Sequence, residues 1–333
     1  MSKPIAVIAG DIHYNLKNLE LANTLTRMAI QCANELKVPF VANGDTQDQK
    51  AMLRAECVNA MIDTFKTAKI KPYVNIGNHD MVNNKGRDHA LNFLRPYAHV
   101  IETSQYINDL KVYIIPYHDD IEELRSYLKT LPPKSTLILH QGLTGSDMGE
   151  YIKDHSALNP DDLKDFTSIL SHYHNHQVIK CGDNLATYVG SGYTQSFGEA
   201  YDNSKGFGVL YDDGELEFIT SNLRRHLAYD LEVNDMMNTR GVFDINKDDL
   251  VRIRLSGPQH LLNEIDKQDF LDKFKLPVNT KIEKINTEII KTTATLSIQH
   301  NKFHAIITNI VNSSDRKDSI LNTMRQVNEI IVI

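Results

Sequence analysis

Short apolar runs of strand length alternate with longer amphipathic stretches along the first 190 or so residues. The runs "PIAVIAG" (4–10) and "FVANGD" (40–45) have strand length, and segment 19–36 between them has helical spacing. Segment 55–68 has helical spacing too. Strands that alternate with helices predict an α/β layered domain. The face that we expect the first helix to bury consists of Leu21, Leu25, Met28, Cys32 and Leu36.

Five of the predicted strands end in a polar cluster. The clusters are "GDIH", "NGD", "GNHD", "LHQG" and "SHYH". In open α/β sheets, ligands bind at the carboxyl ends of the strands. One or two such clusters could arise by chance, but five at five strand ends predict one site. After the fifth cluster the chain continues as a strand near 186–199 and a hairpin over 205–221 with "DDG" as its turn.

The pattern changes at about residue 226. A strand (248–257), one helix opened by Pro258 (258–274) and a strand (279–290) predict a small α+β unit. Two short amphipathic helices, separated at "NSSD", are expected in the tail. We therefore expect three parts: 1–225, 226–295 and 296–333.

Composition excludes several classes of protein. Hydrophobic residues make up 41% and charged residues 24%, as in a globular chain, and no apolar run approaches the roughly 18 residues of a membrane span. Three cysteines without metal or redox spacing, and no secretory signal, predict a cytoplasmic protein. The net charge of −7 argues against a simple basic nucleic-acid binder. DNA stays possible as a substrate, because metal ions and a partner subunit can supply positive charge.

The strand-end residues offer carboxylate, amide and imidazole ligands but no thiolate. That mixture suits manganese, iron or zinc rather than a structural zinc site. Seven ligands are too many for one ion with an open position, and they fit two ions bridged by a carboxylate. Two ions about 3.5–4 Å apart are the usual device for phosphoester cleavage. The seven are Asp11, His13, Asp45, Asn78, His140, His172 and His174.

The order of these motifs resembles that of the calcineurin-like metallophosphoesterases. Within them the chain is similar to the SbcD-type nuclease subunits and their phage recombination-endonuclease relatives, including the stretch 188–211 and the "RRH" at 224–226. The resemblance implies a four-layer β-sandwich flanked by helices (1–225), a small α+β capping domain facing DNA (226–295) and a helical tail (296–333). It also implies two divalent ions, most plausibly Mn²⁺ and alternatively Mg²⁺.

The resemblance assigns the ligands to two ions. The first ion takes Asp11, His13 and His174, the second takes Asn78, His140 and His172, and Asp45 bridges them.

The same resemblance gives His79 a role on the scissile phosphate, where it would stabilise charge or protonate the leaving oxygen. Asp80 would orient His79. The intervening Tyr173 would point away from the ions, and His176 is expected to be a solvated flanking residue.

Two positions depart from the family pattern. Ser171 stands where glycine is usual before the His-x-His pair, which matters only if the backbone there needs a positive φ. Asp48 stands where some relatives have histidine. We expect Asp48 to face solvent, because an aspartate in the site would disfavour an anionic phosphate.

These features predict a DNA exonuclease, with possible single-strand endonuclease activity, acting in recombination or end processing. Its expected partner is an SMC-like ABC ATPase of the SbcC type, in a heterotetramer that contains a homodimer of this chain. The alternatives are a phosphodiesterase or phosphatase for small or protein substrates, and a non-catalytic scaffold. "GDTQDQKA" lacks the Asp-Arg-Gly of the serine/threonine phosphatases, and a scaffold would be expected to lose ligands, whereas none is missing.

The sequence does not decide the role of two candidate interaction surfaces. Arg224 and Arg225 could contact DNA phosphates or form a solvated linker. The apolar stripes of the tail could dock on the ATPase or pack on the protein's own core. The tail residues proposed for docking are Phe303, Ile306, Ile307, Ile310, Leu321, Met324 and Val327.

Overall fold

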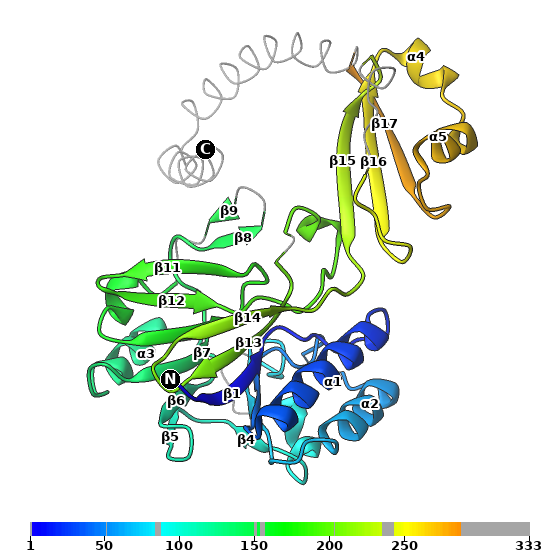
Figure 1. Ribbon diagram of the computed structural model, residues 1–333. Coiled ribbons are helices and arrows are strands. Elements are labelled where there is room, and N and C mark those ends of the chain that lie inside the picture. The colour runs from blue at the N-terminus through cyan, green and yellow to red at the C-terminus, as the bar shows by residue number, and fades with distance from the viewer. Residues whose placement is uncertain are drawn as a thin grey trace, which may run out of the picture. The chain divides into compact units, whose positions relative to one another are not determined.

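The computed structural model describes residues 2–50, 52–83, 88–149, 152–153, 157–202, 204–234 and 243–287 (Figure 1). The chain divides into two compact units. The first comprises 1–228 with 245–251, and the second comprises 229–244 with 252–333. The division therefore falls at residue 228 rather than at 225, and one short segment returns to the first unit. Among the described helices, none has the length and apolar character needed to cross a bilayer.

The first unit contains two six-stranded sheets of mixed direction. The first sheet has the order β14-β13-β1-β2-β3-β4, in which β1 to β4 pair in parallel and β13 pairs antiparallel with both β1 and β14. Its strands are β1 (Pro4–Ala9), β2 (Phe40–Asn43), β3 (Tyr73–Asn75), β4 (His99–Ile101), β13 (Gly206–Tyr211) and β14 (Leu216–Thr220). The predicted hairpin at 205–221 is thus confirmed.

The second sheet has the order β11-β12-β10-β7-β6-β5, with antiparallel strands only at its two edges. Its strands are β5 (Gln105–Ile107), β6 (Val112–Ile115), β7 (Thr136–His140), β10 (Thr167–Ser171), β11 (Gln177–Cys181) and β12 (Asn184–Tyr188). A two-stranded ribbon joins β8 (Asp147–Gly149) and β9 (Ile152–Lys153). Single 3₁₀ turns cover Ala90–Leu94, Pro160–Leu163 and Phe197–Glu199.

The alternation of side chains along the strands produces four layers. Ile8 and Val41 point to a core that they share with Ile138 and Ile169 of the other sheet, so the two sheets pack face to face. The opposite face of the first sheet packs on α1 (Leu19–Leu36) and α2 (Ala55–Phe65), and that of the second sheet packs on α3 (Ile121–Leu128). The predicted α/β layered class is confirmed.

Helix α1 lies where it was predicted, and the predicted buried face is confirmed only in part: Leu25 is buried, and Leu21, Met28 and Cys32 are partly buried against the same core. The residues that face the sheet are Ala22, Leu25, Ala29, Ile30 and Ala33, whereas Leu36 is 38% exposed. Small alanines let the helix approach the sheet closely, so the larger side chains of the expected stripe lie at its margin. Lys37 ends the helix in the left-handed conformation, just before Pro39.

The second unit is built on the three-stranded sheet β15-β16-β17. Its elements are β15 (His226–Glu232), β16 (Leu250–Gly257), α4 (Gln259–Glu264), α5 (Lys267–Phe274) and β17 (Lys281–Asn286). The single helix predicted over 258–274 was wrong. Ile265 is extended, and the Asp266 carboxylate caps a new helix by accepting hydrogen bonds from the amides of Gln268 and Asp269 at 2.8 and 3.0 Å.

Candidate metal centre

The predicted ligands follow the carboxyl ends of five strands from both sheets: β1, β2, β3, β7 and β10. A buried amide network joins the sheets just below them. Asn43 donates to the carbonyl of Leu139 and to Ser171 Oγ, and Asn75 donates to Asn43 Oδ1 and to the carbonyl of Ile115. The strand ends of the two sheets are therefore held together, and the loops that follow them meet at one place.

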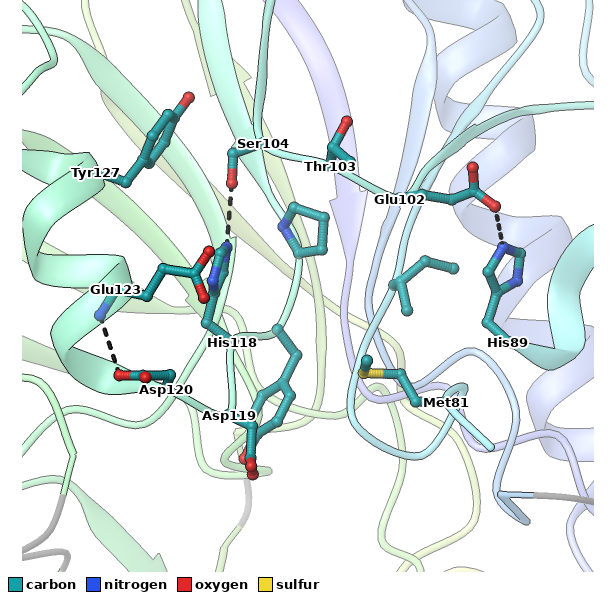
Figure 2. A pocket seen from close by; sticks show the side chains of 13 residues that line it. Met81, His89, Glu102, Thr103, Ser104, His118, Asp119, Asp120, Glu123 and Tyr127 are labelled. Atoms are coloured by element: carbon teal, nitrogen blue, oxygen red, sulfur yellow. Dashed lines mark hydrogen bonds and ion pairs between the residues drawn. The ribbon is translucent and has the colours of Figure 1, made fainter. Parts of the chain in front are cut away.

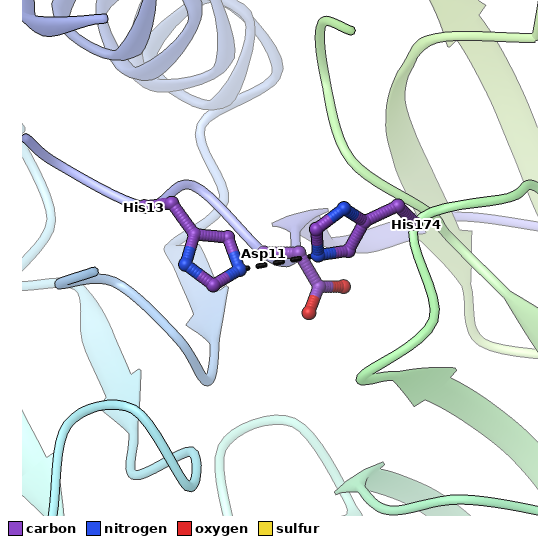
Figure 3. Close-up of side chains that lie close together, drawn as sticks. All are labelled: Asp11, His13 and His174. Atoms are coloured by element: carbon purple, nitrogen blue, oxygen red, sulfur yellow. Dashed lines mark hydrogen bonds between the residues drawn. The ribbon is translucent and has the colours of Figure 1, made fainter. Parts of the chain in front are cut away.

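The first ligand group consists of Asp11, His13 and His174 (Figure 3). One ligand atom from each residue lies within 4.8 Å of the others. The two imidazoles face one another, with Nε2 of His13 and Nε2 of His174 3.2 Å apart. Both carboxylate oxygens of Asp11 accept a hydrogen bond from the His172 amide at 3.1 Å, which ties this group to the second.

The second ligand group consists of Asp45, His140 and His172, whose ligand atoms also lie within 4.8 Å of one another. Asn78 Oδ1 lies 3.2 Å from His140 Nε2 and 3.0 Å from His172 Nδ1. The amide oxygen that was predicted as a ligand therefore points at the same place as the two imidazoles.

The Asp45 carboxylate lies between the two groups. Its Oδ2 is 3.3 Å from His140 Nε2 and 3.8 Å from His13 Nε2, and its Oδ1 accepts a hydrogen bond from the His79 amide at 2.8 Å. Burial works against ionisation, yet the adjacent His140 and His13 hold the pKa of Asp45 well below its usual range. A carboxylate in this position can contact an ion in either group.

The imidazoles of the second group have opposite pKa shifts. Burial opposes the charged form of His140, but the Asp45 carboxylate raises the pKa of His140 to about 9. Burial and the neighbouring His140 lower the pKa of His172 to about 4. One anion, Asp45, thus favours a proton on the nearer ring, and a divalent cation can take the place of that proton.

These residues fit divalent metal ions. Oxygen and nitrogen ligand atoms from residues as far apart as Asp11 and His174 converge, and neither group contains a lysine or arginine. Imidazole, carboxylate and amide oxygen without thiolate are the ligands that manganese, iron and zinc accept. The buried groups can therefore hold metal.

The protein contacts the outer nitrogens of two histidines at hydrogen-bond distance, and the outer nitrogen of a third lies beside a carboxylate, as is usual for metal ligands. His140 Nδ1 lies 2.9 Å from the carbonyl of Asn43, and His174 Nδ1 lies 2.9 Å from Glu199 Oε1. His13 Nδ1 lies 3.3 Å from Asp48 Oδ1. Each contact leaves the Nε2 atom directed at the centre.

Sequence reasoning gave Glu199 no role. Its carboxylate also pairs with Lys205 at 2.8 Å, and Lys205 pairs in turn with Asp202 at the same distance. Burial raises the pKa of Glu199, but the contacts with His174 and Lys205 outweigh it and lower that pKa to about 2. The only signal in the sequence was that Glu199 lies in the stretch 188–211, on which the expected resemblance partly rested.

The expectation that Asp48 faces solvent was wrong. The side chain is partly buried, and its contact with His13 lowers the pKa of Asp48. Its negative charge is directed at an imidazole, so the repulsion of phosphate that the sequence raised is reduced.

His79 lies beside the first group, with its ring edge-on to that of His13 at 4.9 Å between centroids. Its Nδ1 lies 2.7 Å from the carbonyl of Asp48. Because a carbonyl only accepts hydrogen bonds, Nδ1 must carry the proton, and Nε2 is the ring nitrogen that can contact a substrate.

The predicted role of Asp80 in orienting His79 was wrong. The carboxylate is fully buried and accepts hydrogen bonds from the amides of Gly77, Thr46 and Gln47 at 2.9, 3.3 and 2.8 Å. It therefore joins the loops that carry Asn78 and Asp45. Burial and the charge of Asp45 raise the pKa of Asp80 to about 7.

Around the His-x-His pair, the predictions for Tyr173 and Ser171 are confirmed and the prediction for His176 is corrected. Tyr173 is buried in the outer core of the second sheet, as predicted. Ser171 has no positive φ, and a Cβ atom on Gly10 would collide with its hydroxyl, so the small residue at each position makes room for the other. His176 is not merely solvated, because its Nδ1 lies 2.7 Å from the carbonyl of Tyr188 and its ring stacks on Phe218.

Four of the nine described non-glycine residues with a positive φ lie at the centre. Asp11, His13, Asp45 and His172 have φ values of 49°, 51°, 48° and 117°, in the region that residues other than glycine seldom adopt. Such strain persists only where the surroundings over-determine it, and it clusters at functional sites.

The remaining predicted contacts differ in outcome. Arg225 is committed to Asp249, a buried carboxylate that accepts from its amide at 2.8 Å and from its Nη2 at 2.8 Å, so the expected contact of Arg225 with DNA phosphate is not favoured. Arg224 lines a small cavity with Lys205 and Asp202. The seven tail residues from Phe303 to Val327 lie outside the described residues.

Two larger cavities border the centre. One of about 600 Å³ is lined by Tyr117, whose ring lies 5.8 Å from that of His172, and by Glu102, Asp119, Asp120 and Glu123 (Figure 2). Figure 2 shows Glu102 bonded to His89 on one side and Ser104 bonded to His118 on the other. The second, of about 580 Å³, is lined by His174 and Glu199.

No protein-family model and no curated protein matches the chain. The geometry of the centre is therefore what indicates the function.

Proposed function

We propose that this chain is a two-metal phosphodiester hydrolase of the calcineurin-like metallophosphoesterase class. Within that class, we propose the role of an SbcD-type nuclease subunit, which cuts DNA in recombination or end processing together with an SMC-like ATPase. The observation that carries the proposal is the Asp45 carboxylate, with one oxygen 3.3 Å and 3.8 Å from the imidazoles of two separate ligand groups. The two face-to-face sheets with helices outside are consistent with the four-layer sandwich of that class.

The proposed ligand sets follow the two groups. Asp11, His13 and His174 would hold one ion, Asn78, His140 and His172 would hold the other, and Asp45 would be shared. When bound, such ions polarise a phosphoryl oxygen and activate water.

The protein's own residues would orient and protonate. Because the Nδ1 proton of His79 is donated to the carbonyl of Asp48, Nε2 is the ring nitrogen that can approach the phosphate. In the imidazolium form, with a second proton on Nε2, His79 would stabilise developing charge or deliver that proton to the leaving oxygen. Asp80 keeps the Asn78 and Asp45 loops in register through three amide hydrogen bonds. Glu199 and Asp48 hold the two histidines of the first group.

Asp45→Asn tests the proposal, because it removes the shared charge and preserves the shape of the side chain. We expect bound metal to fall and cleavage of linear duplex DNA in Mn²⁺ to be abolished, with the fold intact by circular dichroism. Asp183→Asn, in an exposed turn, is the matched control. Near-normal cleavage by Asp45→Asn with two ions still bound would contradict the assignment.

Two further comparisons test the substrate and the partner. Hydrolysis of bis(p-nitrophenyl) phosphate without any cleavage of DNA would favour the alternative of a small-substrate phosphodiesterase. Deletion of 296–333 should abolish binding of the ATPase while bound metal is retained, since all proposed ligands precede residue 175. Binding of the ATPase at full affinity after deletion would contradict docking through the tail.

A further inference from the structure

The second cavity, which we call the Lys17–Arg54 pocket, opens beside the first ligand group. Four segments line it: the loop after β1 with Leu16 and Lys17, the loop after β2 with Met52 and Arg54, the loop after β10, and the segment between β12 and β13 with Glu199. His174 of the first ligand group is part of its wall. A molecule in the pocket would therefore be adjacent to the proposed chemistry.

The free charge in this pocket is positive. Lys17 and Arg54 are exposed, and across the described ranges the side chain of neither makes a hydrogen bond or ion pair. The two carboxylates in the lining, Asp48 and Glu199, are instead directed at His13 and His174. A chain with a net charge of −7 thus presents two uncommitted cations beside a centre built for phosphate.

Apolar side chains accompany these cations. Leu16 is 49% exposed and Met52 is 53% exposed, and both line the pocket. The Gln47 side chain holds this wall by donating to the carbonyls of Gln49 and Met52, both at 2.7 Å. Exposed apolar surface beside cations suits a ligand with both flat apolar faces and negative charge.

The cavity beside the second ligand group has a different character. Among the described residues its lining holds Glu102, Asp119, Asp120 and Glu123 but no lysine or arginine (Figure 2). Consecutive phosphates would be repelled there. A phosphate-bearing strand that reaches the centre is therefore favoured on the side of the Lys17–Arg54 pocket.

We propose that the Lys17–Arg54 pocket binds the nucleotides that adjoin the scissile phosphodiester, as an unpaired DNA strand. Lys17 and Arg54 contact the neighbouring phosphates, and Leu16 and Met52 contact base or sugar faces. A single strand is required because bases in a duplex are stacked and cannot present their faces to side chains. This inference rests on the proposed phosphodiesterase function and names the substrate subsite of that centre.

The test compares Lys17→Gln, Arg54→Gln and the double variant with Lys129→Gln, an exposed lysine beyond the end of α3. The rate constant kcat/KM in Mn²⁺ is measured for a single-stranded oligonucleotide over a range of salt concentrations, and for bis(p-nitrophenyl) phosphate. Bound metal and the melting temperature check that each variant is folded.

We expect each pocket variant to lose several-fold in kcat/KM on the oligonucleotide, and to lose more there than on the small substrate. The slope of log kcat/KM against log salt should become shallower by about 0.7 for each phosphate of a single strand that the variant no longer neutralises, and by about twice that in the double variant. Lys129→Gln should behave as the wild type.

The contrary outcomes are separable. Cleavage of the oligonucleotide with the salt slopes of both pocket variants equal to that of Lys129→Gln would overturn the pocket and leave the nuclease proposal standing. Hydrolysis of the small substrate alone by the wild type would overturn the pocket and the DNA substrate together. No hydrolysis of either substrate would overturn the proposed function, and the inference with it.

Discussion

Replacement of Glu199 by glutamine tests how strongly an outer carboxylate supports the first ligand group. In the structure Glu199 Oε1 lies 2.9 Å from His174 Nδ1, so the carboxylate fixes the ring and increases the basicity of Nε2. Glutamine has nearly the same shape and can still accept a hydrogen bond through its amide oxygen, but it lacks the charge.

Loss of such a partner typically reduces metal affinity about 10- to 100-fold, or roughly 1.4–2.7 kcal/mol. Because glutamine still accepts the hydrogen bond, we expect Glu199→Gln near the lower end and Glu199→Ala, which removes the acceptor, near the upper end. Titration of Mn²⁺ by calorimetry should show the weakening at one of two sites, since Glu199 contacts only His174 among the proposed ligands.

Asp202→Asn is the matched control. Asp202 pairs with Lys205 at 2.8 Å, as Glu199 does, but it contacts none of the ligand histidines. Equal weakening by Glu199→Gln and Asp202→Asn would show that the charge balance at Lys205 matters rather than the orientation of His174. Unchanged Mn²⁺ affinity in Glu199→Gln would refute the reasoning.

Three more predictions follow from the centre. His79→Ala should leave bound metal intact and reduce the cleavage rate by roughly 10²–10⁴, the usual effect of a general acid or base, and loss of metal instead would make His79 a ligand. Gly44→Ala should lower both the melting temperature and metal binding, because φ is +79° and a Cβ would collide with the His140 ring. Gly145→Ala is the control for backbone strain alone, because φ is +91° there and a Cβ would have no atom within 4 Å. Equal effects of the two substitutions would contradict the collision. Because the pKa of His140 is raised to about 9, its ring is protonated at pH 7 and must lose that proton to bind metal. The affinity for Mn²⁺ should therefore rise up to tenfold per pH unit from pH 7 to 9. Calorimetry at pH 7 in buffers of different ionisation enthalpy should detect the released proton, and the absence of proton release would contradict this prediction.

Local sequence determined the strands and the residue types at their ends. Apolar runs of four to six residues bounded by turn residues predict buried strands, and polar residues directly after them then lie where those strands end. That is why Asp11, His13, Asp45, Asn78, His140, His172 and His174 could be selected from the sequence alone, and the structure brings all seven together. The helical period likewise placed α1 and α2 correctly.

The tertiary structure decided what surrounds those residues. The partners of Asp80 are amides from loops 33 and 34 residues earlier in the chain as well as a neighbour three residues away, and Glu199 meets His174 across 25 residues. Neither set of contacts can be inferred from the side-chain periodicity of a single helix or strand. Similarly, the buried stripe of α1 depends on how closely the helix approaches a sheet formed by distant strands, and the pocket beside Lys17 and Arg54 exists only where four segments meet. Side-chain periodicity reports which residues are buried within one element, whereas hydrogen bonds and cavities between elements depend on distances that only the folded chain sets.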